Sequence, residues 1–265
     1  MSVRRARGAS SAVGQHGLRS LALAQSLVAD AGIRRGDLVL DIGAGSGLLT
    51  RALAEAGAQV LAVERDRALA GRLRARAWPR VEVVCGDARE LVLPQEPFAV
   101  VANLPFAGAS AILAHLLADP ATPLRQADVI VEWGMALKRA AVVPSTLRGA
   151  FWGAWYETVL VRRLPRRAFT PAPAVDAGVL RIRRRRHPLV APGRVEEYHT
   201  FLREAYSVGR LRGGRPVKSA LDRVGAPRDA PATSLDAYQW AELFARVRTQ
   251  PSAGDATLRR TLPPL

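Results

Sequence analysis

The segment VLDIGAGSG, residues 39–47, joins an aliphatic strand to a helix that begins at Leu48. Glycines at positions 43, 45 and 47 let the backbone turn sharply and lie against a ligand without a Cβ in the way. The chain on either side alternates short aliphatic runs with helical stretches, which is the pattern of an α/β fold. Several of these runs are continuously apolar, as parallel strands buried on both faces are. We therefore predict an α/β domain built on a mostly parallel sheet.

Seven runs are candidate strands of this sheet: Leu38–Asp41, Gln59–Glu64, Val81–Cys85, Phe98–Ala102, Val129–Trp133, Tyr156–Val161 and Val179–Arg183. The last differs from the others, because Leu180 and Ile182 alternate with Arg181 and Arg183. A period of two is typical of a strand with one solvated face.

The predicted domain boundary lies where all periodicity stops. Arg183–Arg186 is followed by His187-Pro188 and Pro192-Gly193, and such clusters interrupt regular structure. We predict a flexible basic arm at residues 1–13, the α/β domain at 14–185, a small all-α domain at 193–248 and a disordered tail at 249–265.

The charge of the chain indicates the class of molecule that it binds. The chain of 265 residues has a net charge of +16, and all its cations except Lys138 and Lys218 are arginines. Arginine binds phosphate bidentately and stacks on bases, so we expect an RNA or DNA partner. The single cysteine, Cys85, excludes an internal disulfide and a cysteine-based zinc site, and the scattered histidines predict no metal site. No apolar run is long enough to span a membrane, so we expect a cytoplasmic protein.

The glycine spacing selects the cofactor. A dinucleotide fingerprint needs a glycine three residues after the second one, and that position is Leu48. A loop for S-adenosylmethionine accepts G-x-G-x-G. Glu64 ends the second strand, where a carboxylate can accept both ribose hydroxyl protons, and Asp87 follows the third strand, where it can accept from the adenine amino group. An ordinary strand-to-helix turn is the alternative interpretation.

The sequence Asn103-Leu104-Pro105-Phe106 follows the fourth strand. The lone pair of an exocyclic base amine is delocalised into the ring. If the Asn103 side-chain oxygen and the Leu104 carbonyl accept the two N–H bonds, the nitrogen can pyramidalise and attack a methyl group. Pro105 fixes the local backbone, and Phe106 would stack on an extruded base. No His, Cys or Lys lies near this motif in the sequence, so we expect catalysis by positioning, with the proton leaving to water.

Taken together, these motifs resemble the ribosomal RNA adenine N6-methyltransferases. The resemblance rests on DIGAGSG, Glu64, GDA at 86–88, NLPF and the later Phe169-Thr-Pro-Ala-Pro. The family includes small-subunit dimethyltransferases of KsgA type and the Erm macrolide-resistance enzymes. It implies a Rossmann-like, S-adenosylmethionine-dependent domain with a mostly parallel seven-stranded sheet, followed by a small helical domain. Phe at position 106 and the arginine bias resemble actinobacterial Erm proteins.

The resemblance also implies site residues. Phe169 would close the second face of the target base. The cofactor would be lined by residues from five segments: Gln15, His16, Leu18, Gly43, Gly45, Glu64, Arg65, Asp87, Ala88 and Asn103. One motif departs from the family, since its Q-N-F-L stands here as Gln15-His16-Gly17-Leu18 and lacks the Asn amide and the Phe ring.

Arginine runs flank Phe169 and its prolines, and a further run follows the first helix of the small domain. We expect an RNA-facing surface made by Arg162, Arg163, Arg166, Arg167, Arg183, Arg184, Arg185, Arg186, Arg210, Arg212 and Arg215, although solvated faces and a plain linker are the alternatives.

Three functions remain open. The favoured one is an Erm-type enzyme that methylates N6 of one adenine in the peptidyl-transferase region of 23S rRNA, which would confer macrolide-lincosamide-streptogramin B resistance. We expect it to act as a monomer on RNA that is not yet assembled into the large subunit. The alternatives are a 16S rRNA dimethyltransferase of KsgA type and a non-catalytic nucleic-acid-binding relative. Intact cofactor glycines and NLPF disfavour the last.

Overall fold

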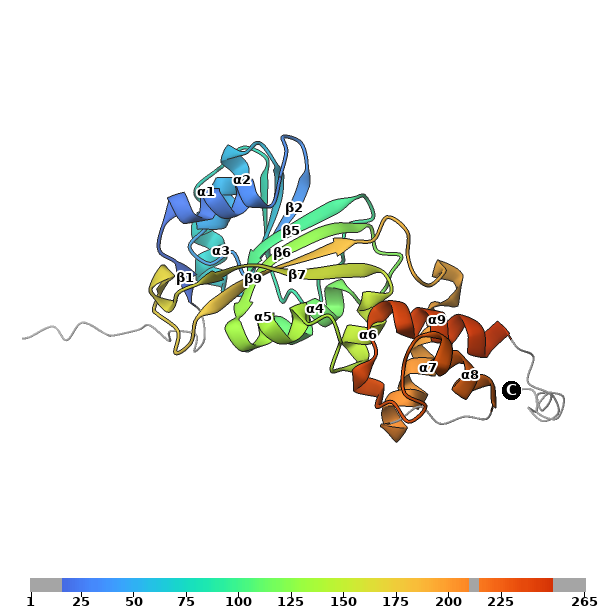
Figure 1. The fold of residues 1–265 in the computed structure, drawn as a ribbon. Coiled ribbons are helices and arrows are strands. Elements are labelled where there is room, and N and C mark those ends of the chain that lie inside the picture. Colours follow the sequence, from blue (N-terminus) through green and yellow to red (C-terminus); the bar gives the residue numbers. More distant parts are fainter. Residues whose placement is uncertain (1–15, 210–214, 250–265) are drawn as a thin grey trace, which may run out of the picture. The chain divides into compact units, whose positions relative to one another are not determined.

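The computed structural model describes residues 16–209 and 215–249 and divides the chain into two compact units. The first unit comprises residues up to 140 together with 157–184. Its centre is a sheet in the order β4-β3-β2-β5-β6-β9-β7 (Figure 1). The strands are β2 (Leu38–Ile42), β3 (Gln59–Glu64), β4 (Val81–Cys85), β5 (Phe98–Asn103), β6 (Leu124–Glu132), β7 (Tyr156–Leu164) and β9 (Ala177–Arg184).

This sheet confirms the predicted architecture. Neighbouring strands from β4 to β6 run parallel, and β9 pairs antiparallel with β6. The central strand β5 is buried from Phe98 to Ala102, as its uninterrupted aliphatic sequence predicts.

The predicted strand at Val129–Trp133 is wrong at both ends. β6 begins at Leu124, and Trp133 is already the first residue of a helix. The early half was missed because Arg125, Gln126 and Asp128 interrupt the aliphatic pattern. Arg125 pairs with Asp37 at 2.9 Å, ahead of β2, and the neighbouring strand β9 supplies partners for Gln126 and Asp128.

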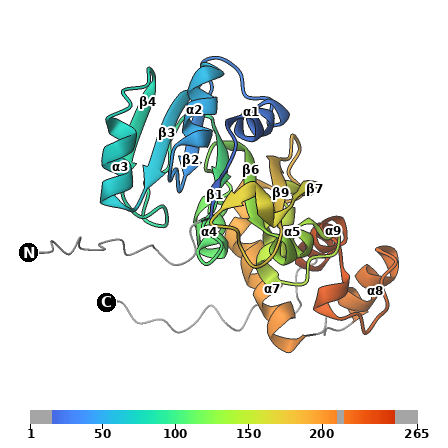
Figure 2. The same ribbon diagram turned by 90° about the vertical axis from the view of Figure 1, so that its left-hand side faces the viewer.

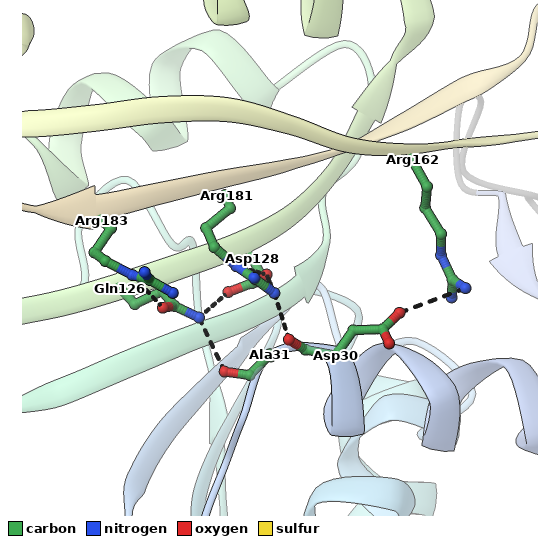
Figure 3. Close-up of polar contacts among 7 residues, drawn as sticks. All are labelled: Asp30, Ala31, Gln126, Asp128, Arg162, Arg181 and Arg183. Carbon is green, nitrogen blue, oxygen red and sulfur yellow. Dashed lines mark hydrogen bonds and ion pairs between the residues drawn. The ribbon is translucent and has the colours of Figure 1, made fainter.

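Figure 3 shows those partners. Arg181 of β9 donates from Nε to Asp128 Oδ1 over 2.8 Å and from Nη2 to the Asp30 carbonyl over 2.5 Å. Gln126 donates to Asp128 and to the carbonyl of Ala31, which lies at 3.0 Å. Asp128 is only 5% exposed, and burying a carboxylate requires such compensation. The alternating arginines of β9 therefore fix the end of the first helix on the sheet.

Five helices belong to this unit: α1 (Leu21–Asp30), α2 (Leu48–Glu55), α3 (Arg67–Arg74), α4 (Ala109–Leu116) and α5 (Trp133–Ala140). Figure 2 shows α3 beside β3 and β4 at one edge of the sheet. Side-chain caps define two helix starts: Ser20 accepts from Leu23 N, and Asp66 accepts from Ala68 N and Leu69 N. Such caps satisfy N–H groups that have no partner within the helix.

A separate two-stranded ladder joins distant parts of the chain. β1 (Gly17–Leu18) pairs antiparallel with β8 (Phe169–Thr170), and η1 (Arg166–Ala168) immediately precedes β8. This ladder brings His16–Leu18 against the Phe169-Thr-Pro segment.

The second unit contains residues 141–156 and the chain from 185 onward. Its helices are α6 (Leu147–Gly153), α7 (Val195–Val208), α8 (Arg215–Arg223) and α9 (Ala237–Thr249), with 3-10 turns η2 (Pro192–Arg194) and η3 (Ala232–Ser234). Its core is aromatic: the Phe151 ring lies 4.9 Å from Trp155, and Tyr198 lies 5.1 Å from Phe244.

The predicted division at residue 185 therefore needs one correction. Residues 141–156 were assigned to the catalytic domain, but Phe151 and Trp155 pack on Tyr198 of α7. Large aromatic side chains are stabilised by burial, and these two are buried among the helices of the second unit. The predicted arm at 1–13 and tail, apart from residue 249, lie outside the described residues.

Candidate active site

A cavity of about 690 Å³ opens at the carboxyl ends of the parallel strands in the first unit. Crevices at this edge are the usual ligand sites of α/β sheets, and the volume suits a cofactor-sized ligand. Its lining includes most of the predicted cofactor and catalytic residues: His16, Leu18, Gly43, Gly45, Glu64, Arg65, Asp87, Ala88, Asn103, Leu104, Pro105 and Phe106. Gln15 lies outside the described residues.

The glycine loop adopts a backbone that other residues rarely take. Gly43, Gly45 and Gly47 have φ of 74°, 55° and 83°, and positive φ favours glycine. A Cβ on Gly47 would lie 2.6 Å from the Leu73 side chain. Position 47 therefore requires glycine for both conformational and steric reasons.

Glu64 is anchored where the sequence predicts a ribose-binding carboxylate. It is 1% exposed and lines the cavity. One oxygen accepts from Gly45 N over 2.8 Å and the other accepts from Asp66 N over 2.8 Å. Each carboxylate oxygen keeps a further lone pair, so the group is oriented and still able to accept two hydroxyl protons.

Asp41 of β2 lies two residues before Gly43, and no role was predicted for it from the sequence. It is 1% exposed and accepts from Thr50 Oγ1 over 2.6 Å. Burial raises the pKa of Asp41 to about 7; the Thr50 hydrogen bond acts against this shift, and the nearby Glu64 charge adds to it. The strand that leads into the glycine loop therefore carries a buried carboxyl group whose pKa is raised by its burial.

Asp87 carries an ion pair that sequence analysis also missed. Its Oδ1 accepts from the backbone N and Nε of Arg89 over 2.9 Å each, and Oδ2 accepts from Nη2 over 2.5 Å. The Arg89 hydrogen bonds hold the pKa of Asp87 well below its usual range. The carboxylate is thus ionised and fixed at the cavity, as an acceptor for an amino group must be.

Asn103 ends β5 with one half of its amide satisfied. Nδ2 donates to the His16 carbonyl over 2.7 Å. Oδ1 is buried and has no hydrogen-bond partner in the described structure. A buried unsatisfied acceptor is costly and invites an explanation. An N–H donor on a ligand in the cavity would satisfy it.

Two further rings lie near Phe106, one of them unexpected. The His16 ring centroid lies 5.4 Å from that of Phe106, at 51°. The motif therefore does have a histidine nearby in space, although none is near in sequence. His16 Nδ1 donates to the Pro171 carbonyl over 2.8 Å, so this nitrogen is already engaged.

Phe169 is placed differently from the sequence prediction. Its ring meets Phe106 edge to face at 6.4 Å and is 1% exposed within the hydrophobic core. The cavity lining includes its neighbour Thr170 but not Phe169. In this structure the Phe169 ring is buried in the hydrophobic core and packs against Phe106 instead of lining the cavity.

Many predicted RNA-binding arginines have partners within the chain. Arg162 pairs with Asp30 at 3.4 Å, as Figure 3 shows. Arg163 pairs with Asp176 at 2.7 Å, and Arg183 donates to Gln126 over 3.1 Å. Arg184 donates to the carbonyls of Pro120, Thr122 and Leu124. Arg185 donates to the Gly153 carbonyl and to Tyr238 Oη.

The other predicted arginines divide into two groups. Arg166, Arg167 and Arg186 are exposed, and their guanidinium groups make no hydrogen bond or ion pair with described residues. Arg210 and Arg212 lie outside the described residues, and Arg215 begins α8. In the described segments no group of three His, Cys, Asp or Glu side chains could hold a metal ion, and no helix is long and apolar enough to cross a membrane.

Comparisons with known proteins agree with this geometry. The family model for ribosomal RNA adenine dimethylases matches residues 8–232. The mycinamicin-resistance protein MyrB of Micromonospora griseorubida is 34% identical over 248 residues, covering 85% of this chain and 79% of that protein. The ribosomal RNA small subunit methyltransferase A of Synechococcus sp. is 34% identical over 256 residues, covering 87% and 89%. The crystal structure of the 23S rRNA methyltransferase ErmE aligns with a TM-score of 0.76 at 31% identity, covering 88% of this chain and 99% of that one.

Proposed function

Because the chain belongs to the ribosomal RNA adenine dimethylase family, we propose that it transfers a methyl group from S-adenosylmethionine to N6 of an adenine in the peptidyl-transferase region of 23S rRNA, and thereby confers macrolide-lincosamide-streptogramin B resistance. The chain is an S-adenosylmethionine-dependent rRNA adenine N6-methyltransferase. The large-subunit target rests on similarity to a mycinamicin-resistance protein and to a 23S rRNA methyltransferase.

One observation carries the chemistry: the buried, unpartnered Oδ1 of Asn103. Its orientation is set because the other half of the amide is bonded to the His16 carbonyl. We assign Oδ1 and the Leu104 carbonyl as acceptors for the two N–H groups of the target amine. Accepting both hydrogens pulls the nitrogen lone pair out of conjugation, and Phe106 supports the base by stacking.

The residues present fit the cofactor. The glycine loop leaves room for close approach, Glu64 offers lone pairs for the ribose hydroxyls, and Asp87 offers one for the adenine amine. When bound, S-adenosylmethionine supplies a methyl group on a positively charged sulfur. The chain aligns the amine with that methyl, and the amine nitrogen then loses one proton to water. Alignment of this kind can lower a barrier by about 7 to 11 kcal/mol without acid-base catalysis.

A second target has a specific observation in its favour. The small-subunit methyltransferase A of Synechococcus sp. is as similar in identity as MyrB, so 16S rRNA is the alternative substrate. We further propose that the enzyme works as a monomer in the cytoplasm, on rRNA before the subunit is assembled, where a base can still be extruded into the cavity.

Primer extension on total rRNA from cells that express the chain separates these targets, because a methylated adenine stops or slows reverse transcription at one nucleotide of one subunit. We expect a new stop in the peptidyl-transferase region of 23S rRNA. The control is the Asn103→Ala variant, which keeps the cofactor glycines and should give no stop. A stop in 16S rRNA alone would replace the 23S proposal with the small-subunit alternative.

A further inference from the structure

An arginine at the cavity, Arg19, is joined through the backbone to the turn η1, which carries Arg167. Arg19 lines the cavity and is exposed. Its backbone N donates to the carbonyl of Ala168, the last residue of η1, over 3.0 Å. Arg167 immediately precedes Ala168 in the chain. The β1–β8 ladder thus brings the backbone of Arg19, which lines the cavity, next to η1, although Arg19 and Arg167 are 148 positions apart in sequence.

These two side chains differ from most arginines of this unit. Arg162, Arg163, Arg181 and Arg183 each have a carboxylate or amide partner. Arg19 and Arg167 are exposed, and in the described part of the chain their guanidinium groups form neither a hydrogen bond nor an ion pair. Asp176, which accepts from the backbone N of Arg166 in η1, is also engaged by Arg163. These two positive charges therefore remain uncompensated.

The reaction brings negative charge to this place. The proposed substrate base must leave its stack and enter the cavity beside Asn103 and Phe106, which are part of the same lining as Arg19. Its ribose and flanking phosphates remain part of the continuous RNA strand, so they stay at the opening when the base alone is extruded. A guanidinium group binds a phosphodiester through two parallel N–H bonds.

We propose, resting on the function proposed above, that Arg19 and Arg167 form a phosphate-binding site for the RNA backbone next to the target adenosine. This site fixes the nucleotide at the cavity opening while its base is extruded. Sequence analysis included Arg167 among many RNA-facing arginines, but it did not single out Arg19, because Arg19 stands alone in its segment.

The test compares Arg19→Gln, Arg167→Gln and the double variant with the wild type and with Arg72→Gln. Arg72 is a matched control because it is an exposed arginine on α3 that does not line the cavity. The RNA is a transcript of whichever rRNA the wild type methylates. For Arg19→Gln and for Arg167→Gln we expect RNA binding to weaken by roughly 3- to 10-fold, and the slope of log affinity against log salt to fall by about 0.7 to 1, whereas Arg72→Gln should bind RNA as the wild type does. Binding of S-adenosylmethionine and thermal stability should not change.

A modified substrate locates the contact. A methylphosphonate on either side of the target adenosine removes one negative charge from the backbone. At one of the two positions it should weaken binding to the wild type and to Arg72→Gln, but it should have much less effect on the double variant, since the partner charges are already gone.

Three results would overturn the site: unchanged RNA affinity and salt slope in the double variant, an equal methylphosphonate effect in all proteins, or weaker S-adenosylmethionine binding by Arg19→Gln, which would place Arg19 on the cofactor. A wild type that methylates neither rRNA would instead refute the proposed function and, with it, this site. Methylation of rRNA by the wild type therefore distinguishes failure of the proposed function from failure of the proposed phosphate-binding site.

Discussion

The side chain of Asn103 is held by the backbone of His16, since Nδ2 donates to the His16 carbonyl over 2.7 Å. This contact needs no particular side chain at position 16. It explains how the active-site amide can remain oriented although the family's Q-N-F-L motif stands here as Gln15-His16-Gly17-Leu18.

Asn103→Asp tests that relationship. The variant keeps an acceptor oxygen at the cavity but places a second acceptor against the His16 carbonyl, where no hydrogen bond can form. We expect methylation to fall at least about 100-fold, the size of the loss when one preorganised polar contact is removed. His16→Asn is the control, because it keeps the carbonyl, and it should retain most activity in single-turnover methylation. Wild-type rates for Asn103→Asp would show that orientation by His16 is irrelevant.

The two phenylalanines should separate catalysis from stability. Phe106 is half-buried at the cavity and Phe169 is 1% exposed in the core. Phe106→Leu should lower the methylation rate more than Phe106→Tyr, because stacking needs the ring, with little change in unfolding. Phe169→Ala should cost roughly 3 to 5 kcal/mol of unfolding free energy, as core truncations do. Urea denaturation and methylation assays on the same samples check both. If Phe169→Ala were as stable as the wild type but inactive, the Phe169 ring would contact the target base and not merely stabilise the core.

Glu64 should govern cofactor binding alone. Glu64→Ala removes the acceptor for the ribose hydroxyls and also the bond to Gly45 N. We expect calorimetry to show S-adenosylmethionine binding weakened by roughly 1 to 3 kcal/mol, with RNA affinity unchanged. Glu82→Ala, an exposed carboxylate on β4 outside the cavity, is the control. Preferential binding of NADH by the wild type would contradict the choice of cofactor.

The arginine run 183–186 should not act as one RNA-binding unit. Arg184 donates to three carbonyls in the segment that leads into β6, so Arg184→Met should lower the unfolding free energy by roughly 1 to 3 kcal/mol. Arg186 is exposed and makes no such bond among the described residues. Arg186→Gln should leave stability unchanged and reduce only the salt dependence of RNA binding. Equal effects of both changes on RNA binding, with no loss of stability, would support the original prediction of a shared surface.

How far the sequence could predict this molecule depends on what each residue type reveals locally. The aliphatic runs at Val81–Cys85 and Gln59–Glu64 predicted their strands to the residue. The first half of β6 was missed because its polar residues are compatible with a strand only when Arg181 lies opposite. The glycine loop predicted the cavity, since backbone freedom is a property of the residue itself.

Partnerships between distant residues could not be predicted in the same way. No local pattern indicates that Arg163 pairs with Asp176 while Arg167 stays free, or that His16 approaches Phe106. Similarly, Phe151 and Trp155 were assigned to the sheet domain because their preference for burial does not say which core will accept them. Charge and hydrophobicity therefore predicted the class of contact, and only the fold determined the contact made.

Asp41 gives the expected pH dependence. Burial raises the pKa of this carboxyl group from 3.8 to about 7 in the folded chain, so the folded state binds a proton that the unfolded chain releases near pH 4. Stability from this group is complete below pH 3.8 and is lost as the pH rises to about 7, at up to about 1.4 kcal/mol for each pH unit. Asp41→Asn cannot ionise but can still accept the Thr50 hydroxyl. Subtracting its unfolding free energy from that of the wild type removes the contribution of all other carboxylates.

The unfolding free energy of the wild type minus that of Asp41→Asn, measured by urea denaturation at intervals from pH 4 to pH 8, should decline as the pH rises and level off above pH 7. The glycine loop that follows Asp41 also holds Glu64 through Gly45, so S-adenosylmethionine binding should weaken over the same interval in the wild type and stay constant in Asp41→Asn. A constant difference in stability across the whole interval would mean that Asp41 is ionised in the folded chain, and that the Thr50 hydrogen bond outweighs burial.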